Sequence, residues 1–169
     1  MKEHEADVEV KVAVVSISTS RWEKYGYKRG IENVPEEDAS AKIVIEALNC
    51  VDYRLVPDSK LSILRAIVEL AEFADVIVAV GGTGISPTDV TVEVVKRIVD
   101  KEIDGFGEIF RKLSYDEIGI DAMLSRAFAG VFDGRIIFCL PGSKGAVKLG
   151  VKLISDILRH AVSHARGLR

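Results

Sequence analysis

The sequence predicts an α/β fold of three layers, in which helices cover both faces of a mainly parallel sheet with one antiparallel hairpin at an edge. Short apolar segments rich in β-branched residues alternate with longer segments whose apolar residues recur at helical spacing. The segment Val76–Val80 is apolar throughout, which is typical of a strand buried on both faces of a parallel sheet. Asp133-Gly134 separates two further apolar segments, and this dipeptide is a strong signal for a hairpin turn.

Length and composition indicate a single domain, residues 1–169, in which the charged residues 1–9 are expected to be flexible. The formal net charge of −3 gives no overall attraction to nucleic acid or to an anionic membrane, so we expect neither as a partner. No apolar run is long enough to span a bilayer and the N-terminus does not resemble a signal peptide, so we expect a cytoplasmic location. Cys50 and Cys139 lack metal-binding spacing and are interpreted as small buried hydrophobic residues.

The first strand is predicted over residues 10–18, where alternation gives way to a continuous apolar run. Residues 22–34 are predicted to be a long connection. Its aromatic and cationic side chains could cover a substrate, or it could be a surface flap fixed by Trp22, and we favour the flap. A helix is expected to begin at Pro35, because proline suits the first helical position, and to end at Asn49.

The second strand is predicted over Tyr53–Val56, and either Asp58 or Ser59 caps the helix that follows. The expected buried stripe of this helix consists of Leu61, Leu64, Ile67, Val68 and Phe73. The apolar run Val76–Val80 is the next strand.

Thr91 is the expected N-cap of a helix that reaches Asp100. The elements predicted after it are a very short strand at Ile103, helices over 105–118 and 122–125, strands over 127–132 and 135–140, and a closing helix over 146–164.

Four polar clusters follow predicted strands. They are Ser18–Arg21, Asp58-Ser59, Gly81–Asp89 and Pro141–Ser143. The carboxyl ends of parallel strands lie at one edge of a sheet, and ligands of such sheets bind there. We therefore expect these distant segments to form one site.

The segment Gly81-Gly82-Thr83-Gly84 lies between a predicted strand and a predicted helix. Its three glycines allow positive φ angles and leave main-chain N–H groups accessible to an anion such as phosphate. The hydroxyls of Thr83 and Ser143 and the cation of Lys144 would add to a phosphate site. The segment has neither the Gly-Lys-Ser/Thr spacing of a P-loop nor the glycine spacing of a Rossmann fingerprint. A tight turn that binds nothing is the alternative.

Two acidic residues, Asp58 and Asp89, are expected beside this segment. Carboxylates next to a phosphate site usually indicate Mg²⁺, because unscreened carboxylates would repel the anion. Asp58 could equally be a helix cap. Asp89 could be a turn residue, which is the weaker interpretation because Thr91 is available as the cap.

Together these segments resemble the MoaB/MogA proteins of molybdenum cofactor biosynthesis, which are related to the G domains of molybdenum-insertion proteins such as gephyrin. The matching segments are Val80–Gly84, Asp89-Val90-Thr91, Pro57-Asp58, Gly105–Glu108 and Leu140–Ser143, in family order over nearly the whole chain. Phe106–Arg111 and Leu113–Gly119 are most similar to the MoaB branch.

The resemblance implies molybdopterin binding and the adenylylation of molybdopterin by MgATP with release of pyrophosphate. It implies Asp58 and Asp89 as catalytic residues, and Asp89, with Asp58 as a second candidate, as ligand of Mg²⁺. The residues that it implies for substrate or nucleotide binding are Ser18, Ser40, Gly81, Gly82, Thr83, Gly84, Ser86, Glu108, Pro141, Gly142 and Ser143. It also implies a homotrimer or homohexamer.

Two segments depart from the family pattern. Ser18-Thr19-Ser20-Arg21 stands where the family often has Ser-Asp-x-Arg, and Asp38-Ala39-Ser40-Ala41 stands where it has Asp-x-Ser-Gly. These departures motivate an alternative function, a non-catalytic molybdopterin carrier or scaffold. The choice between molybdenum and tungsten as the eventual metal stays open.

Overall fold

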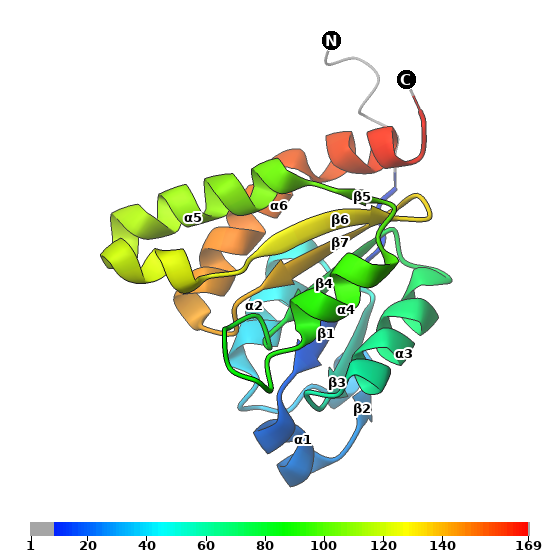
Figure 1. The fold of residues 1–169 in the computed structure, drawn as a ribbon. Helices are drawn as coiled ribbons and strands as arrows, with labels where there is room; N and C mark the ends of the chain where they lie inside the picture. The colour runs from blue at the N-terminus through cyan, green and yellow to red at the C-terminus, as the bar shows by residue number, and fades with distance from the viewer. Residues whose placement is uncertain (1–8, 169) are drawn as a thin grey trace.

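The structure, a computed structural model, describes residues 9–168 and contains one seven-stranded sheet between two layers of helices (Figure 1). The strand order is β2-β3-β1-β4-β7-β6-β5. The parallel strands at the centre are β3 (Asp52–Val56), β1 (Val12–Ile17), β4 (Val76–Val80) and β7 (Arg135–Leu140). The antiparallel strands are β2 (Lys28–Arg29) at one edge and β6 (Phe128–Phe132) and β5 (Lys101–Glu102) at the other. The predicted α/β fold is confirmed, with antiparallel strands at both edges instead of one.

Helices cover both faces of this sheet (Figure 1). One face carries α2 (Ala39–Leu48), α5 (Asp104–Ile118) and α6 (Lys144–Ala165), and the other carries α3 (Lys60–Ala71) and α4 (Thr91–Ile98). The short helix α1 (Thr19–Tyr25) lies at the end of β1, and the 3-10 helix η2 (Gly119–Leu124) follows α5. None of the helices within residues 9–168 is both long and apolar enough to cross a membrane.

The central strands are buried on both faces. In β1, Val12 and Val14 join the core beneath α2 and α6, while Ala13 and Val15 join the core beneath α3 and α4. Burial on both faces explains why these strands are continuous apolar runs instead of alternating ones.

The order of the strands reverses beside β1. The chain passes from β1 to β3 on one side and then returns to β4, which pairs with the other side of β1. In open α/β sheets such a reversal leaves a crevice at the carboxyl ends of the strands, where ligands bind. The glycine-rich segment after β4 therefore lies at the crevice where ligands bind in such sheets.

The prediction that residues 22–34 are a long connection is wrong. Ser18 accepts a hydrogen bond from the N–H of Arg21 and caps α1, which includes Trp22. β2 and a 3-10 turn, Ile31–Asn33, follow. The helical pattern was not visible because α1 has only 7 residues and none of them is buried. The expectation for residues 1–9 lies outside the described residues, except for Glu9.

The predicted start of α2 and the predicted cap of α4 are also wrong. α2 begins at Ala39 instead of Pro35, because the carboxylate of Asp38 accepts the N–H of Ala41 and caps the helix. Thr91 is the first residue of α4 and not its cap, since its hydroxyl donates to the carbonyl of Gly81. The predicted helix end at Asn49 is confirmed by its left-handed φ of 51°.

The predicted stripe of α3 is wrong in part. Leu61, Val68 and Phe73 are exposed. The residues that α3 buries are Ile63, Ala66, Ile67, Leu70 and Ala71. The buried face contains two alanines, whose weak apolar character does not mark a face in the sequence.

Two smaller predictions are confirmed. Asp133 and Gly134, with φ angles of 46° and 76°, form the turn that joins β6 and β7. Cys50 and Cys139 are buried, and burial raises the pKa of Cys50 to about 12, so neither is a reactive thiolate at neutral pH.

Candidate functional site

The carboxyl ends of the parallel strands meet at one edge of the sheet, as predicted. The N–H of Ser18, after β1, donates to the carbonyl of Val56 in β3 at 3.0 Å. The N–H of Gly81, after β4, donates to the carbonyl of Leu140 in β7, also at 3.0 Å. The segments that follow the four strands are therefore neighbours.

The glycine loop, Gly81–Gly84, has every carbonyl oxygen hydrogen-bonded from within the protein. Thr91 donates its hydroxyl to the carbonyl of Gly81 at 2.8 Å and its N–H to the carbonyl of Gly82 at 3.1 Å. Arg126 donates its Nε–H to the carbonyls of Thr83 and Gly84 at 3.2 and 3.0 Å. These four bonds fix the orientation of four consecutive peptide groups.

The N–H groups of the same peptides point the other way. A trans peptide directs its C=O and N–H to opposite sides, so the N–H groups of Gly82, Thr83, Gly84 and Ile85 face away from Thr91 and Arg126. None of these N–H groups donates to an acceptor within residues 9–168. A row of unbonded N–H groups is a site for an anion such as phosphate.

Each glycine of the loop is required by a close neighbour. A Cβ at Gly81 would lie 2.3 Å from the carbonyl oxygen of Ile17, and one at Gly82 would lie 2.4 Å from the hydroxyl of Thr91. A Cβ at Gly84 would lie 2.6 Å from Oδ2 of Asp89. Gly81 and Gly82 also have positive φ angles, of 101° and 66°. The glycines therefore let the loop pack against β1, α4 and an acid at once.

Asp58 is not a helix cap. Ser59 caps α3 by accepting the N–H of Ser62. Oδ2 of Asp58 instead accepts the hydroxyl of Thr19 at 2.7 Å and the N–H of Thr19 at 3.2 Å. Its Oδ1 would lie 3.1 Å from a Cβ at Gly82 and has no hydrogen-bond partner in the part of the chain that the structure describes. Asp58 thus presents one free oxygen beside the glycine loop.

Asp89 has a similar arrangement on the other side of the loop. Its Oδ2 accepts the N–H of Ser86 at 3.0 Å, which closes a turn, and lies against Gly84. Its Oδ1 has no hydrogen bond or ion pair to any residue between 9 and 168. Asp89 is therefore both the turn residue that the sequence allowed and an acid with one oxygen available to a cation.

The start of α6 is a second candidate place for an anion. The hydroxyl of Ser143 accepts the N–H of Ala146 at 3.3 Å and caps α6, which leaves the hydroxyl proton free to donate. Lys144 and Gly145 form the first turn, where main-chain N–H groups and the helix dipole attract negative charge. Gly142 lies against Gly81, since a Cβ there would be 3.7 Å from the Cα of Gly81.

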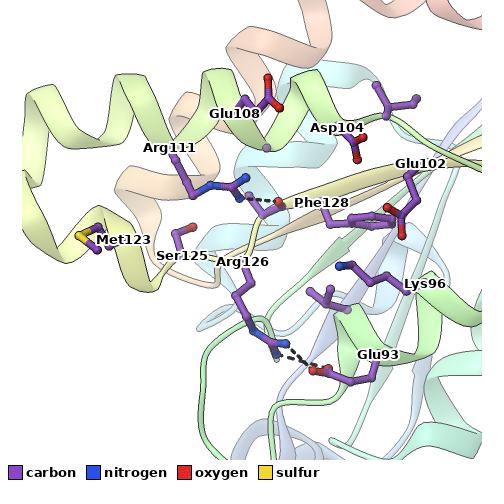
Figure 2. Close-up of a pocket in the computed structure, with 14 residues that line it drawn as sticks. Glu93, Lys96, Glu102, Asp104, Glu108, Arg111, Met123, Ser125, Arg126 and Phe128 are labelled. Carbon is purple, nitrogen blue, oxygen red and sulfur yellow. Dashed lines mark hydrogen bonds and ion pairs between the residues drawn. The ribbon is translucent and has the colours of Figure 1, made fainter.

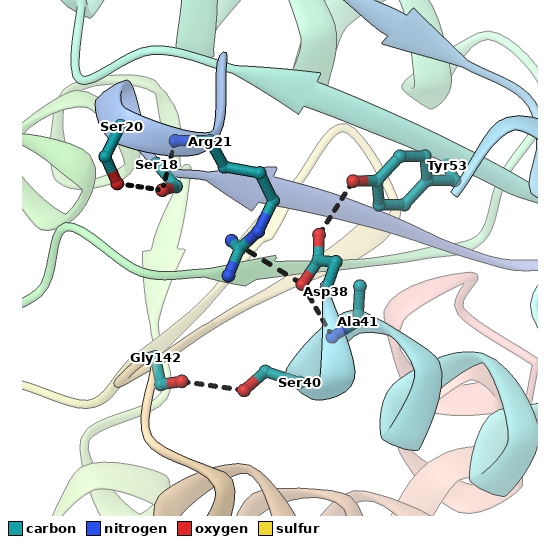
Figure 3. A network of polar contacts seen from close by, with 8 residues as sticks. All are labelled: Ser18, Ser20, Arg21, Asp38, Ser40, Ala41, Tyr53 and Gly142. Atoms are coloured by element: carbon teal, nitrogen blue, oxygen red, sulfur yellow. Dashed lines mark hydrogen bonds and ion pairs between the residues drawn. The ribbon is translucent and has the colours of Figure 1, made fainter. Parts of the chain in front are cut away.

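A polar network centred on Asp38 supports this end of the site (Figure 3). The carboxylate of Asp38, which is 1% exposed, accepts the hydroxyl of Tyr53 at 2.7 Å and lies 3.6 Å from the guanidinium of Arg21. Burial and the bond to Asp38 raise the pKa of Tyr53, so its hydroxyl stays a donor. Beside the network, the hydroxyl of Ser40 donates to the carbonyl of Gly142 at 2.7 Å and holds the segment before α6.

A cavity of about 380 Å³ lies beside the glycine loop and the start of α6. The implied site residues that line it are Gly81, Gly82, Thr83, Gly84, Asp89, Pro141, Gly142 and Ser143. Asp58 lies against the loop from the segment after β3, whereas Ser18 caps a helix and Ser40 supports the segment before α6. Ser86 is exposed, and its N–H holds Asp89.

Glu108 is not brought to this cavity. It lines a separate cavity of about 530 Å³ together with Glu93, Lys96, Asp104 and Arg111 (Figure 2). In Figure 2 its side chain points away from Arg126 on the far side of α5.

The residues that the sequence did not indicate come from α5 and η2. Phe110, Ser114 and Ile118 form one stripe of α5 along the cavity. Asp121 and Leu124 of η2, and Ser125 directly after it, also line the cavity. The four-residue spacing of Phe110, Ser114 and Ile118 places them on one helix face. This spacing is the feature of the sequence that could have grouped them. The sequence does not indicate Arg126 either, because nothing in its local sequence connects it with the loop.

Fold and site together define an α/β domain with a glycine-rich loop of unbonded N–H groups where the strand order reverses. Residues 13–160 match the family model MoCF_biosynth, described as "Probable molybdopterin binding domain". The chain is 45% identical over 166 residues to the "Probable molybdopterin adenylyltransferase" of Methanocaldococcus jannaschii, which covers 96% of this chain and 98% of the relative. It is 43% identical over 139 residues to the "Molybdopterin adenylyltransferase" of Pyrococcus furiosus, covering 77% of this chain and 82% of the relative.

A solved structure gives the same result. The crystal structure of the tungsten cofactor synthesizing protein MoaB from Pyrococcus furiosus matches with a TM-score of 0.82 and 37% identity, covering 95% of this chain and 99% of that one. The chain therefore belongs to the MoCF_biosynth family and, within it, to the MoaB/MogA-type proteins, as the sequence indicated.

The capping assignment can be tested by two substitutions at adjacent positions. Ser59→Ala removes the cap of α3 and is expected to lower the free energy of unfolding by about 1 kcal/mol. Asp58→Asn keeps an oxygen that can accept the hydrogen bonds of Thr19. It is expected to change the free energy of unfolding by less than about 0.5 kcal/mol. Urea denaturation measures both. A larger loss in Asp58→Asn than in Ser59→Ala would mean that Asp58 is mainly structural.

Proposed function

We propose that this protein adenylylates molybdopterin, using ATP and releasing pyrophosphate. The observation that carries the proposal is the glycine loop, whose unbonded N–H groups lie between two carboxylates that each have a free oxygen. Membership of a molybdopterin-binding family and the names of two relatives, both molybdopterin adenylyltransferases, support the choice of substrates.

The chemistry explains why such a site is needed. A phosphate oxygen of molybdopterin attacks the α-phosphorus of ATP, and the bond from the α-phosphorus to the oxygen that bridges to the β-phosphorus breaks. Both reactants are anions, so charge repulsion and alignment are the main obstacles. The glycine loop and the start of α6 are adjacent and would each bind phosphate oxygens, which aligns the two reactants and offsets their repulsion.

The two carboxylates fit the binding of Mg²⁺. Asp58 and Asp89 each keep Oδ1 free while Oδ2 is fixed by a hydrogen bond, so both side chains are oriented before a cation arrives. Mg²⁺ in nucleotide sites is held by one or two carboxylates together with substrate phosphates, and bound there it neutralises phosphate charge. Gly82 and Gly84, which have no Cβ, leave room for the two carboxylates beside the loop.

The departures from the family pattern do not disturb the acids. Thr19, at a position where the family often has aspartate, donates two hydrogen bonds to Asp58 and fixes it. Ala41, where the family has glycine, donates its N–H to Asp38 as a helix cap requires. These contacts favour turnover over the alternative of a carrier that only binds.

Turnover is tested directly by incubating the protein with molybdopterin and MgATP under anaerobic conditions. The expected products are adenylylated molybdopterin and pyrophosphate in equal amounts. Molybdopterin binding by folded protein without release of pyrophosphate would support the carrier and contradict the proposal.

Asp58 and Asp89 are expected to act in turnover and not in folding. Asp89→Asn and Asp58→Asn should each lower the rate of pyrophosphate release by about 100-fold or more, the scale of losing one electrostatic stabiliser. Asp156→Asn, on the exposed side of α6, is the matched control and should keep wild-type turnover. The melting temperature of all three variants is measured on the same samples. Full activity of Asp89→Asn would remove it from the catalytic residues.

We also propose that the chain forms a homotrimer or homohexamer. In Figure 1, α5 and η2 extend beyond the edge of the sheet. Six of their apolar side chains are 53% to 71% exposed. They are Ile109, Tyr115, Ile118, Ile120, Met123 and Leu124. Such an extended apolar surface is unusual on a monomer. Since Ile118 and Leu124 also line the cavity, a partner subunit would border the site.

Light scattering at micromolar concentration is expected to give the mass of three or six chains. Ile120→Glu places a charge in the apolar surface and should shift the mass toward one chain. Val51→Glu, at an exposed apolar position just before β3, is the control and should leave the mass unchanged. A wild-type mass of one chain would contradict the proposal.

A further inference from the structure

Arg126, between η2 and β6, makes an unusual set of contacts. Its Nε–H donates to the carbonyls of Thr83 and Gly84 at 3.2 and 3.0 Å, across more than 40 residues of sequence. Its two terminal nitrogens, Nη1 and Nη2, donate to the two carboxylate oxygens of Glu93 in α4, the second at 3.3 Å (Figure 2). A forked pair of this kind has a fixed geometry as well as a favourable charge.

These contacts argue against Arg126 as a direct phosphate ligand. Three of its five N–H groups, one from each guanidinium nitrogen, donate to the protein, and the charge is compensated by Glu93. The pairing lowers the pKa of Glu93 and raises that of Arg126, so both groups stay charged. Arg126 also lies on the carbonyl side of the glycine loop, opposite to the N–H groups.

We propose that Arg126 is a positioning residue for phosphate binding: it holds the carbonyls of Thr83 and Gly84 so that the N–H groups of Gly84 and Ile85 face the ligand. If these peptides turned over, carbonyl oxygens would face the phosphate and repel it. Glu93 fixes Arg126 in this position. The inference rests on the proposed function for the identity of the substrate, but its test does not depend on turnover.

Glu93 keeps the guanidinium of Arg126 in a fixed position. It lies two residues after Thr91 in α4, so one helix supplies both the donor that holds Gly81 and Gly82 and the carboxylate that holds Arg126. The side chains of Arg126 and Glu93 are 32% and 40% exposed, so the pair is a surface one whose contribution to folding is expected to be small. Its effect should therefore appear mainly in ligand affinity.

The test is the affinity for inorganic pyrophosphate with Mg²⁺, measured by calorimetry on full-length variants. Arg126→Gln removes the fork and the charge, and Arg126→Lys keeps the charge but cannot donate to two carbonyls and a carboxylate in one plane. Both are expected to weaken pyrophosphate binding by about 10- to 100-fold, the scale for a small displacement of binding groups. Glu93→Gln should also weaken pyrophosphate binding, but by a smaller factor.

The matched control is Arg135→Gln. Arg135 also donates its Nε–H to a main-chain carbonyl, that of Ala71 at 2.6 Å, pairs with Asp133 and has a side chain 32% exposed, but it lies at the start of β7, away from the loop. Arg135→Gln should lower the melting temperature as much as Arg126→Gln does, and it should keep the wild-type affinity for pyrophosphate.

Three results would overturn the inference. Wild-type affinity in Arg126→Gln would mean that the loop does not need the residue. Full affinity in Arg126→Lys with loss in Arg126→Gln would mean that the charge binds phosphate directly. Equal losses in Arg126→Gln and Arg135→Gln would mean a general effect of stability. If wild-type protein binds pyrophosphate but forms no adenylylated product, the proposed function fails and the role of Arg126 is still decided by these affinities.

Discussion

The site depends on one constraint, the fixed orientation of four consecutive peptide groups in the glycine loop. Thr91 and Arg126 bind all four carbonyl oxygens, and the N–H groups of these peptides consequently face away from both residues. The anion site that we propose here needs no cationic side chain in contact with the phosphate. It also needs no rearrangement when the ligand arrives, which is the property that makes electrostatic stabilisation effective.

The same constraint explains why the acids and the glycines occur together. A Cβ at Gly84 would clash with Asp89 at 2.6 Å, and one at Gly82 would make a tight contact of 3.1 Å with Asp58, so glycine at 82 and 84 leaves room for both carboxylates. Carboxylates beside a phosphate site would be repulsive alone, and their free oxygens are the groups that a divalent cation would use. The strand ends supply the frame, since β1, β3, β4 and β7 deliver these segments to one edge of the sheet.

Much of this could be predicted from the sequence, and the exceptions share one cause. The strands, the hairpin, the glycine loop, both acids and the Pro141–Ser143 segment follow patterns that are local in sequence. The helix caps could not be predicted as well, because adjacent polar residues such as Asp58 and Ser59 are equally good caps by their local sequence. Tertiary contacts decide which of them caps the helix. Arg126 and the stripe of α5 could not be connected with the loop, since that connection depends on how distant elements pack.

The most direct test is to observe the loop amides while a ligand binds. In ¹⁵N-labelled protein, we predict that Mg²⁺ with α,β-methylene-ATP moves the amide resonances of Gly82, Thr83, Gly84 and Ile85 further than any others, with proton shifts downfield as hydrogen bonds to phosphate form. The amide of Gly134, in the hairpin at the opposite end of the sheet, should stay in place. Saturating binding of the analogue with unchanged resonances for these four amides would contradict the central claim.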